Sequence, residues 1–498
     1  MATVSTTDAP PSAARDRYEA VIGVEVHCQL RTASKMFCSC SMDYDGAPPN
    51  SHVCPVCLGL PGALPVINRR AVEHVLATGL AVEATTPDAT RWDRKNYFYP
   101  DLPKGYQISQ YDLPLASAGR LAIETSDGPF TIGITRAHLE EDTAKLVHAT
   151  DAQGRKVSLV DFNRSGAPLM EIVTDPDIRT AEQARRYAEE LQLLLRTIGA
   201  SDADMERGQM RVEANVSLRP RGTEAFGTRV EVKNMNSFRS VERAIEFEID
   251  RQAAALDAGE TLALETRGWS DERGETYHMR SKETSDDYRY FPEPDLPPLH
   301  VDPAWLDALR AVMPELPGAR RARYQAALGL GGYDAAVLTA DPDATALFEA
   351  TLAAAEGIAP KSVANWVTGE YLRLRKGAAA DAAVRVEAAE LAAIIRAVEA
   401  GDLSRSNAKE VFEAHVESGE PAATIIATRG FRQISDSGAV GTAVDEVLAA
   451  NPAAVADYRA GKVQAVGFLV GQVMKATRGQ ANAAIVQAAV RERLDRAE

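Results

Sequence analysis

Cysteine is scarce in this sequence, and long apolar segments are missing from it. Five cysteines in 498 residues are too few for a disulfide framework. No apolar run approaches the roughly 20 residues that a membrane-spanning helix needs. The first seventeen residues carry Asp8 and Asp16 without an apolar core, which excludes a secretory signal. We therefore expect a cytoplasmic protein in a reducing compartment, with residues 1–17 as a disordered leader.

The phosphate-binding motifs of two large nucleotide-binding classes are also absent. The sequence contains neither G-x-x-x-x-G-K-[ST] nor G-x-G-x-x-G, so any nucleotide is held without a P-loop or a Rossmann turn. It shows no Ser-Ser-Lys amidase segment and no Cys-His glutaminase arrangement. A reaction that consumes ammonia would therefore depend on another chain to release it. The net charge of −16 argues against a chain that coats nucleic acid over its whole surface, but it allows a local basic face.

The residue pattern divides the sequence into a mixed part and a helical part. Residues 18–298 combine strand patterns with a few helices and hold all five cysteines and six of the eight histidines. The segment 288–298 has four prolines in eleven residues, which predicts a domain edge. Beyond it the sequence is rich in alanine and helical. We expect an α+β catalytic domain over 18–298 with an antiparallel or mixed sheet, followed by all-α segments: a linker (299–344), a helical domain (345–425) and a tail domain (426–498).

Alternating apolar residues predict strands that each bury one face. The other face of each strand then gathers polar residues. Residues 180–199 instead show the period of a helix, with a capping box from Thr180 and Gln183 and a terminal glycine. The polar strand faces carry Glu25 and His27 in 18–30, Glu213, Asn215 and Ser217 in 211–219, and Arg229, Glu231 and Lys233 in 228–233.

Four of the five cysteines form two close pairs on one loop. Thirteen residues separate the pair Cys38 and Cys40 from the pair Cys54 and Cys57. A tetrahedral Zn²⁺ needs four soft ligands at about 2.3 Å, and close pairs at the ends of a short loop supply them with little closure entropy. The pattern predicts a structural zinc site; reduced thiols with a redox role for the second pair are the alternative. Cys28 lies on an apolar strand face and is expected in the core.

The carboxylates on the polar strand faces predict a second metal site. A phosphoryl-transfer site holds Mg²⁺ with hard oxygen ligands, beside cationic groups for the phosphate. Glu25, His27 and Glu213 could meet there with the run His138-Leu-Glu-Glu-Asp142, which follows an expected strand at 131–135. The alternative is a set of solvated charges on the strand faces.

An aromatic and basic segment at 94–111 is a second candidate for ligand binding. It contains five aromatic rings and three basic groups in eighteen residues. Such a segment can stack on a base or hold phosphates. Ordinary packing explains the same composition.

Nine ordered motifs extend from about Tyr18 to the C-terminal region. They are VIGVEVH (21–27), CPVCLGLP (54–61), RKNYFY (94–99), YQISQ (106–110), LEED (139–142), DFNRSG (161–166), VKNMNSF (232–238), SDDYRYFPEP (285–294) and VGFLVGQVMK (466–475). Together they closely resemble the B-subunit family of the aspartyl/glutamyl-tRNA amidotransferases. The resemblance implies a catalytic domain related in fold to glutamine synthetase and guanido kinases, then a helical region and a tail domain that contacts tRNA.

The resemblance also implies a reaction, that of a glutamine-hydrolysing ligase that forms a C–N bond. Members of this family use ATP and Mg²⁺ to phosphorylate the side-chain carboxylate of Glu or Asp misacylated on tRNA(Gln) or tRNA(Asn). Ammonia then displaces the phosphate. It arrives through a channel from a glutaminase partner, the A subunit, and the small C subunit straps the two together as a heterotrimer.

The same resemblance assigns roles to individual residues of this sequence. It assigns Mg²⁺ to Glu25, His27, Glu140 and Glu213, with Glu141 as a further ligand or an ammonia gate. It assigns the binding of ATP or of the aminoacyl end of the tRNA to Lys95, Tyr99, Arg164, Asn215 and Lys233. The quartet Cys38, Cys40, Cys54 and Cys57 matches the zinc-bearing branch of the family, which favours a structural role.

The tail is slightly basic, unlike the whole chain. Residues 426–498 contain nine Lys or Arg and seven Asp or Glu, and a helix is expected over 461–477. One interpretation is a plain helical bundle; the resemblance favours a tail whose Lys462, Lys475 and Arg478 contact tRNA phosphates. Two other functional classes stay open: a zinc-stabilised tRNA scaffold with an inert carboxylate face, and a standalone ammonia ligase that acts on free glutamate.

Overall fold

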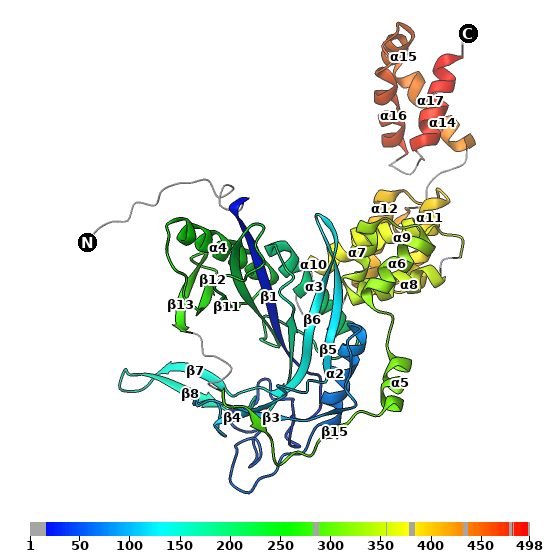
Figure 1. Cartoon of the computed structure of the whole chain (residues 1–498). Coiled ribbons are helices and arrows are strands. Elements are labelled where there is room, and N and C mark those ends of the chain that lie inside the picture. The colour runs from blue at the N-terminus through cyan, green and yellow to red at the C-terminus, as the bar shows by residue number, and fades with distance from the viewer. Residues whose placement is uncertain are drawn as a thin grey trace. The chain divides into compact units, whose positions relative to one another are not determined.

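The computed structural model describes residues 16–281, 288–354, 356–377, 384–431, 437–477, 481 and 483–496. The chain divides into two compact units, of which the first ends at Pro317 and the second begins at Gly318 (Figure 1). The first unit holds every strand in the described ranges, and the second consists of helices. This distribution confirms the expected α+β part followed by a helical part.

A mixed sheet of eight strands forms the centre of the first unit (Figure 1). Neighbouring strands are antiparallel, except for one parallel pair formed by residues 230–233 and 265–268. Segments far apart in the sequence thus lie side by side. In spatial order the strands are β13 (Glu275–Ser281), β12 (Glu265–Ser270), β11 (Val230–Met235), β10 (Met210–Pro220), β1 (Tyr18–Gln29), β9 (Pro168–Thr174), β6 (Gly128–Glu141) and β5 (Ala116–Thr125).

One face of this sheet is packed into the hydrophobic core, because apolar and polar residues alternate along the strands. In β1, Ile22, Val24 and Val26 are at most 1% exposed, and Cys28 joins them in the core as expected. Three helices pack into the same core: α2 (Arg69–Ala81), α3 (Ala181–Thr197) and α4 (Phe238–Asp257). The opposite face of the sheet is left for the polar side chains.

Helix α3 begins with the capping box that the sequence predicts. The Thr180 hydroxyl accepts a hydrogen bond from the Gln183 N–H at 3.1 Å, and the Gln183 amide oxygen accepts one from the Thr180 N–H at 3.3 Å. Replacing Thr180 by Ala removes the first bond, and we expect the free energy of unfolding to fall by about 1 kcal/mol. Urea denaturation of T180A beside T180S, which keeps the hydroxyl, measures this. An equal loss in both variants would contradict the capping role.

Smaller strand pairs lie beside the main sheet in the first unit. The proline-rich segment 288–298, expected at a domain edge, takes part in one of them, and its Glu293 carboxylate accepts two hydrogen bonds from Arg94 at 2.7 Å. Proline is tolerated there because the strand is a two-residue edge strand. The pairs are β14 (Phe291–Pro292) with β3 (Asp93–Asn96) and β3 with β4 (Tyr106–Ser109), β15 (Leu299–His300) with β2 (Ala89–Thr90), and β7 (Lys145–Thr150) with β8 (Lys156–Asp161). Helix α5 (Pro303–Val312) follows.

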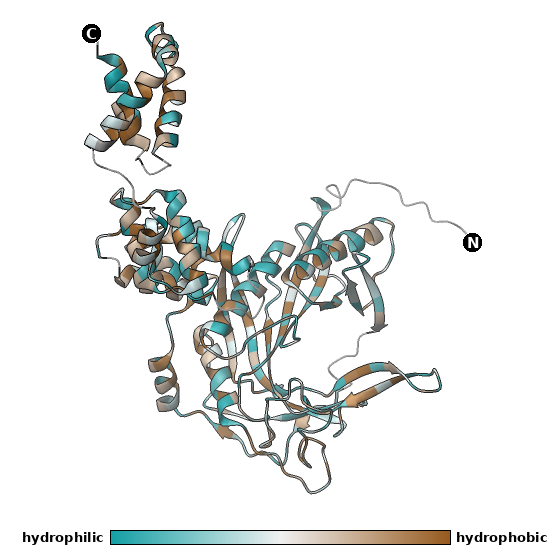
Figure 2. Cartoon of the chain, turned by 180° about the vertical axis from the view of Figure 1, so that it is seen from behind, coloured by the Kyte–Doolittle hydropathy of each residue, from teal (hydrophilic) through white to brown (hydrophobic). Residues whose placement is uncertain are grey.

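The helices of the second unit pack around two hydrophobic clusters, one with Phe348 and Phe412 and one with Leu469 and Val490. Figure 2 shows the hydrophobic faces of the C-terminal helices turned toward one another. Gly461 has a φ of 94°, a left-handed value, so the helix expected from that residue begins later, as α16. Within the described ranges, no helix combines the length and hydropathy of a membrane span. The helices are α6 (Pro317–Leu328), α7 (Gly332–Thr339), α8 (Pro342–Ala354), α9 (Pro360–Trp366), η2 (Val367–Tyr371, a π-helix), α10 (Leu372–Gly377), α11 (Ala388–Glu399), α12 (Arg405–Ser418), α13 (Ala422–Arg429), α14 (Ser437–Ala450), α15 (Pro452–Arg459), α16 (Ala465–Ala476) and α17 (Ala483–Asp495).

Candidate active site and cysteine cluster

The polar face of the main sheet carries a row of charged side chains that crosses four strands. The strand register places Arg211 of β10 opposite His27 of β1, and His27 opposite Glu171 of β9. Glu171 in turn lies opposite His138 of β6. Side chains of directly opposed residues leave the same face of a sheet, so the four groups are neighbours. The register therefore builds a polar cluster from segments that are distant in the sequence.

This face lines a cavity of about 1110 Å³. Glu140 and Glu171 at its wall are only 2% and 4% exposed, so the alternative of solvated charges fails for these two. Charged groups buried to this degree are retained only when they are paired or bind an ion. Seven of the expected site residues line the cavity: Glu25, His27, Lys95, Tyr99, Glu140, Glu213 and Lys233.

His27 lies at the centre of the carboxylates. Its Nε2 atom is 3.3 Å from Glu171 Oε2, 3.5 Å from Glu25 Oε1 and 3.8 Å from Glu140 Oε1. Two groups of three ligand atoms lie within 4.8 Å of one another: Glu25, His27 and Glu171, and His138, Glu140 and Glu171. The donors are mostly carboxylate oxygens, which suits a hard divalent cation.

The pKa values in this cluster reflect crowded negative charge. Burial and the neighbouring Glu171 raise the pKa of Glu25 to about 7. Burial lowers the pKa of His27, but the hydrogen bond to Glu171 and the charges of Glu171 and Glu25 outweigh it and raise that pKa to about 9. At neutral pH His27 is therefore protonated and Glu25 partly so. A bound cation would do what these protons do, which is to offset the carboxylate charge.

Positive side chains flank the acidic cluster. Lys233 Nζ lies 2.7 Å from Glu213 Oε2. Burial lowers the pKa of Lys95, but Glu140 and Glu171 outweigh burial and hold that pKa well above its ordinary value. Both lysines therefore carry charge at neutral pH. This combination of carboxylates and fixed cations is suited to a phosphorylated ligand.

Tyrosine side chains form one wall of the same cavity. Tyr111 and Tyr290 stack with ring centroids 4.2 Å apart and an interplanar angle of 12°. Tyr288 meets the rings of Tyr290 and Tyr97 edge to face at 5.9 and 6.1 Å, and Lys95 Nζ lies 5.2 Å from the Tyr288 ring. The rings come from the segment 94–111 and from the proline-rich segment, which the pairing of β3 with β14 brings together. The wall offers aromatic surface to a planar ligand.

Glu141 is separated from Glu140 by strand geometry. The sequence suggested a strand that ends near residue 135, but β6 continues through Glu141. Alternate residues of a strand face opposite sides, so Glu140 reaches the cavity and Glu141 does not. The Glu141 carboxylate instead pairs with Lys104 and accepts a hydrogen bond from the Ile108 N–H at 3.0 Å. The metal-ligand option for Glu141 thus has no geometric support.

Arg164 and Asn215 also lie outside the residues that line this cavity. The Arg164 guanidinium donates to the carbonyl oxygens of Thr143 at 2.9 Å and Ala144 at 2.8 Å, which fixes the chain after β6. Asn215 is on the polar face of β10 as expected, but its register places it two residues beyond Glu213, farther along the strand. Both therefore stay predictions as contacts of ATP or the aminoacyl end.

Glu171 is the central residue that sequence reasoning missed. It belongs to both groups of potential ligands and also lies 3.3 Å from Arg136. Its signal is visible in the sequence: it is the one charged residue in the apolar strand PLMEIVT of β9. A lone carboxylate in a buried central strand needs a partner, because its burial is otherwise costly. Sequence reasoning also missed Arg211. Its carboxylate partner Asp142 follows β6, whereas Arg211 itself lies on β10.

The buried ion pair of Asp142 with Arg211 predicts a pH effect on stability. Asp142 is 4% exposed and lies 3.3 Å from two guanidinium nitrogens of Arg211. Burial raises its pKa, but Arg211 and Arg164 outweigh burial and lower it from 3.8 to about 2. A carboxylate with a lowered pKa stabilises the fold fully above its ordinary pKa, and this contribution is lost as the pH falls through the lower value.

We therefore expect D142N to lower the free energy of unfolding by about 2 kcal/mol at neutral pH. The difference from wild type should shrink as the pH falls from about 4 toward 2, since the native carboxylate is then protonated as well. Urea denaturation at neutral pH and at about pH 3 measures both values. A deficit that is the same at both pH values would contradict the ion-pair explanation.

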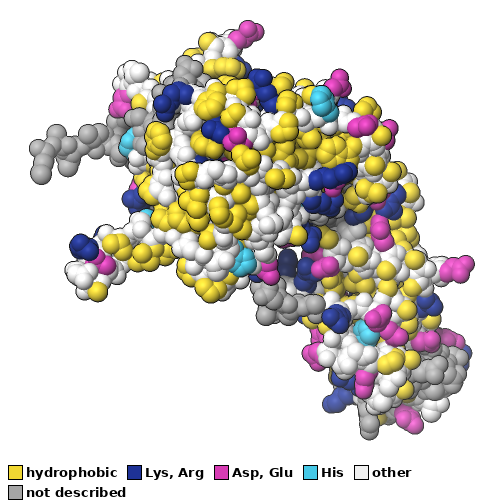
Figure 3. Space-filling view, turned by 90° about the horizontal axis from the view of Figure 1, so that it is seen from below, with side chains coloured by type: hydrophobic (Ala, Val, Ile, Leu, Met, Phe, Trp, Pro, Cys, Tyr) yellow, Lys and Arg dark blue, Asp and Glu magenta, His cyan; other side chains and the backbone are white. Residues whose placement is uncertain are grey.

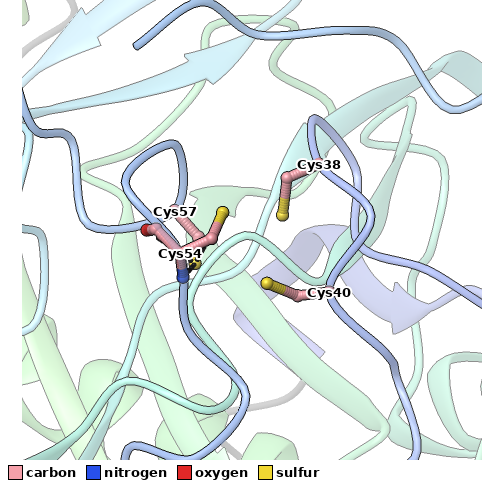
Figure 4. Close-up of side chains that lie close together, drawn as sticks. All are labelled: Cys38, Cys40, Cys54 and Cys57. Atoms are coloured by element: carbon pink, nitrogen blue, oxygen red, sulfur yellow. Dashed lines mark hydrogen bonds between the residues drawn. The ribbon is translucent and has the colours of Figure 1, made fainter.

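The four paired cysteines converge as the sequence predicts. Their Sγ atoms all lie within 4.8 Å of one another, and the two arms of the loop approach from opposite sides (Figure 4). The Sγ atoms of Cys54 and Cys57 are 3.9 Å apart. Four ligands at about 2.3 Å from a tetrahedral centre are separated by about 3.8 Å, so the cluster fits one tetrahedral ion. No disulfide joins these cysteines in the described structure.

The motif DFNRSG (161–166) supports the cysteine loop. Asn163 accepts a hydrogen bond from the His52 N–H and donates one to the Pro48 carbonyl, both at 2.8 Å. The Ser165 hydroxyl donates to the Cys57 carbonyl at 3.1 Å. Gly166 has a φ of 81°, and a Cβ there would lie 3.4 Å from the Cβ of Cys57. The motif is therefore a platform under the second cysteine pair, and its glycine permits the close approach.

The fold and the cavity define an enzyme-like α+β protein with two metal-capable clusters, and comparison with known proteins gives its family. Residues 20–307 match the GatB/GatE catalytic domain and residues 346–494 match the GatB domain. The chain is 52% identical to the B subunit of the aspartyl/glutamyl-tRNA(Asn/Gln) amidotransferase of Moorella thermoacetica over 480 residues, which are 96% of this chain and 100% of the relative. The B subunits of the same enzyme from a Roseiflexus species and Thermomicrobium roseum are each 51% identical, over 96% of this chain and 99% of the relative. The chain belongs to this family of amidotransferase B subunits, which confirms the resemblance of its motifs.

Proposed function

We propose that this chain carries the kinase and transamidase steps of an aspartyl/glutamyl-tRNA amidotransferase. It phosphorylates the side-chain carboxylate of Glu on tRNA(Gln) or Asp on tRNA(Asn) with ATP, and ammonia then displaces the phosphate to give the amide. A carboxylate is a poor electrophile, and the acyl phosphate supplies its leaving group. One observation carries this proposal: a buried carboxylate and histidine cluster lies beside charged lysines in a chain of this family.

The acidic cluster is our proposed Mg²⁺ site. Glu25, His27, Glu140 and Glu171 surround one point on the polar sheet face, and their oxygen-rich donor set supports this choice. Glu213, paired with Lys233, stays a prediction as a ligand. A cation held here would offset the charge of a transferring phosphate. Protonated His27 and partly protonated Glu25 imply that cation binding releases protons, so we expect it to weaken as the pH falls through about 9 and further as the pH falls through about 7.

We assign nucleotide and aminoacyl binding to the rest of the cavity. Lys95 and Lys233 line the cavity together with the acidic cluster, and they can bind phosphate oxygens. The tyrosine wall with Tyr99 and Tyr290 can stack on a purine ring. Arg164 and Asn215 stay predictions for which the cavity geometry gives no support.

Glu141 fits the alternative role in ammonia passage. It is 3% exposed, pairs with Lys104 and lines a separate cavity of about 210 Å³ together with Lys104. Its backbone belongs to the same strand as Glu140, so the two cavities lie on opposite sides of β6. We propose that the Lys104–Glu141 pair separates this small cavity from the acidic cluster and controls the entry of ammonia.

We propose that the cysteine cluster holds a structural Zn²⁺. The convergence of four thiols on one tetrahedral volume supports this, and all four ligand positions would then be filled by protein. Zinc in this place would tie the loop 38–57 to the DFNRSG platform. A reducing cytoplasm, as expected for this chain, keeps the thiols available as ligands.

The partner chains and tRNA are the proposed macromolecular ligands. Hydrophobic side chains gather on the surface of the first unit (Figure 3), and Leu64, Val66 and Phe98 are 64%, 73% and 80% exposed. Such exposure supports contact with the glutaminase (A) and small (C) subunits of the complex. In the tail, Lys475 is exposed on α16 and Lys462 pairs with Asp457 at 2.9 Å; both stay predictions for tRNA contact, and Arg478 lies outside the described residues.

The decisive experiment combines this chain with both partner subunits, glutamine, ATP and Mg²⁺, and supplies Glu-tRNA(Gln) and Asp-tRNA(Asn) side by side. We expect γ-phosphate transfer to the aminoacyl carboxylate and an amidated product with at least one of the two. Absence of product with both would refute the proposal. Full activity of E25A or H27A would instead favour the inert tRNA scaffold, and activity on free glutamate without tRNA would favour the standalone ligase.

A further inference from the structure

Lys35 is a fully buried cation at the base of the cysteine loop. Its side chain is 0% exposed, and its ammonium group donates to the carbonyl oxygens of His52 at 2.8 Å and Phe162 at 3.4 Å. Among the residues that the structure describes, no carboxylate forms an ion pair with it. An ammonium taken out of water and bonded only to neutral carbonyls costs several kcal/mol. The Glu141 carboxylate lies nearby, with its Oε2 atom 3.9 Å from the position of a Cβ at Gly166, but it is already paired with Lys104. The counter-charge of Lys35 must therefore come from another group.

The cysteine cluster is the other group that adjoins Lys35. The Lys35 N–H donates to the Cys40 carbonyl at 2.9 Å, so the lysine adjoins the first cysteine pair. A Cβ at Gly166 would lie 3.4 Å from Cys57 Cβ and 3.8 Å from Lys35 Cδ, so the lysine also adjoins the second pair. Four thiolates around one Zn²⁺ carry a net charge of −2, since the metal ligand is the deprotonated thiolate.

We propose that Lys35 is the counter-charge of the zinc–thiolate cluster and a positioning residue for both cysteine pairs. Its ammonium offsets one unit of the cluster charge and favours the thiolate form that the metal needs. Its hydrogen bonds join the arm that carries Cys54 to the turn at Phe162, while its backbone holds the arm that carries Cys40. This inference rests on the proposed zinc site and is independent of the proposed amidation.

The test is zinc affinity of the full-length chain, measured by competition with a chromophoric chelator. K35M keeps an apolar stem but removes the charge and the donors, and K35Q removes the charge but keeps an N–H donor. We expect both variants to bind zinc about 10- to 100-fold more weakly than wild type. Co²⁺ titration, followed by its thiolate charge-transfer band, gives the same comparison spectroscopically. Circular dichroism checks that each variant is folded. If K35M does not fold, the comparison of K35Q with wild type is the test.

The matched control is K156M, which makes the same change at an exposed lysine of β8. We expect its zinc affinity to equal that of wild type. Wild-type affinity in both K35M and K35Q, or an equal loss in K156M, would overturn the inference. A loss in K35M alone, with K35Q normal, would assign the effect to hydrogen bonding and overturn the counter-charge role. A wild-type chain without zinc affinity would overturn the zinc site itself, whatever the amidation assay shows.

Discussion

Replacing Glu171 by glutamine is expected to lower the amidation rate on the order of 100-fold or more while the chain stays folded. Glutamine keeps the size of the side chain and removes the charge that lies 3.3 Å from His27 and 3.6 Å from His138. Glu171 belongs to both groups of potential ligands, so one change weakens both. The rate of amidated tRNA formation in the reconstituted complex measures the effect.

The control for this prediction is E246Q, which makes the same chemical change on an exposed position of α4. Its activity and its Mg²⁺ dependence should match those of wild type. For E171Q we expect a higher Mg²⁺ requirement as well as a lower rate, because a lost ligand weakens cation binding. Wild-type activity of E171Q at ordinary Mg²⁺ concentration would remove the acidic cluster from the catalytic site.

Replacing Cys54 and Cys57 together by serine is expected to abolish zinc binding and to destabilise the first unit by several kcal/mol. The apparent binding free energy of a structural zinc is about 10–16 kcal/mol in small zinc peptides, and a large share of it is folding free energy. For a unit of this size we expect the thermal midpoint to fall by roughly 10 °C. Metal analysis of the purified chain and calorimetry measure the two quantities.

Cys28→Ala is the matched control for the cysteine prediction. Cys28 is 0% exposed and lies on the core face of β1, away from the cluster. It should cost some stability through the lost core contact, but it should leave the zinc content unchanged. A C54S/C57S variant with full zinc content and an unchanged thermal midpoint would show that the convergence of the four thiols has no role in the fold.

Local patterns were sufficient for the features that depend on neighbours in the sequence. The polar face with Glu25 and His27 followed from alternation in β1, and the capping box of Thr180 followed from spacing in α3. The cysteine cluster followed from two close pairs, because a short loop must bring its ends together. Each of these three features can be predicted from the residues of one helix, one strand or one loop alone.

The features that sequence reasoning missed depend on strand register. Glu171 meets His27 and His138 only because β9 lies between β1 and β6. The lone charge of the strand PLMEIVT is visible in the sequence, but local patterns do not show which residues it meets, and His27 is more than a hundred residues away. Glu141 was grouped with Glu140 because the expected strand stopped too early, so the alternation that separates them was overlooked. The role of DFNRSG as a platform also depends on contacts with residues 48–57, far away in the sequence.

The order of the strands has a consequence for how this chain matures on the ribosome. β1 is the first strand of the described residues to be synthesised, yet its two neighbours in the sheet are β9 and β10, which end at Thr174 and Pro220. Until residue 220 has emerged, an apolar strand with an open edge is exposed to the solvent and to other chains. The row of charged side chains from Arg211 to His138 forms only when β1 has paired with both β9 and β10. Catalytic competence is thus among the last properties that the nascent first unit acquires, and we expect chaperone binding to the emerging N-terminal segment before that point.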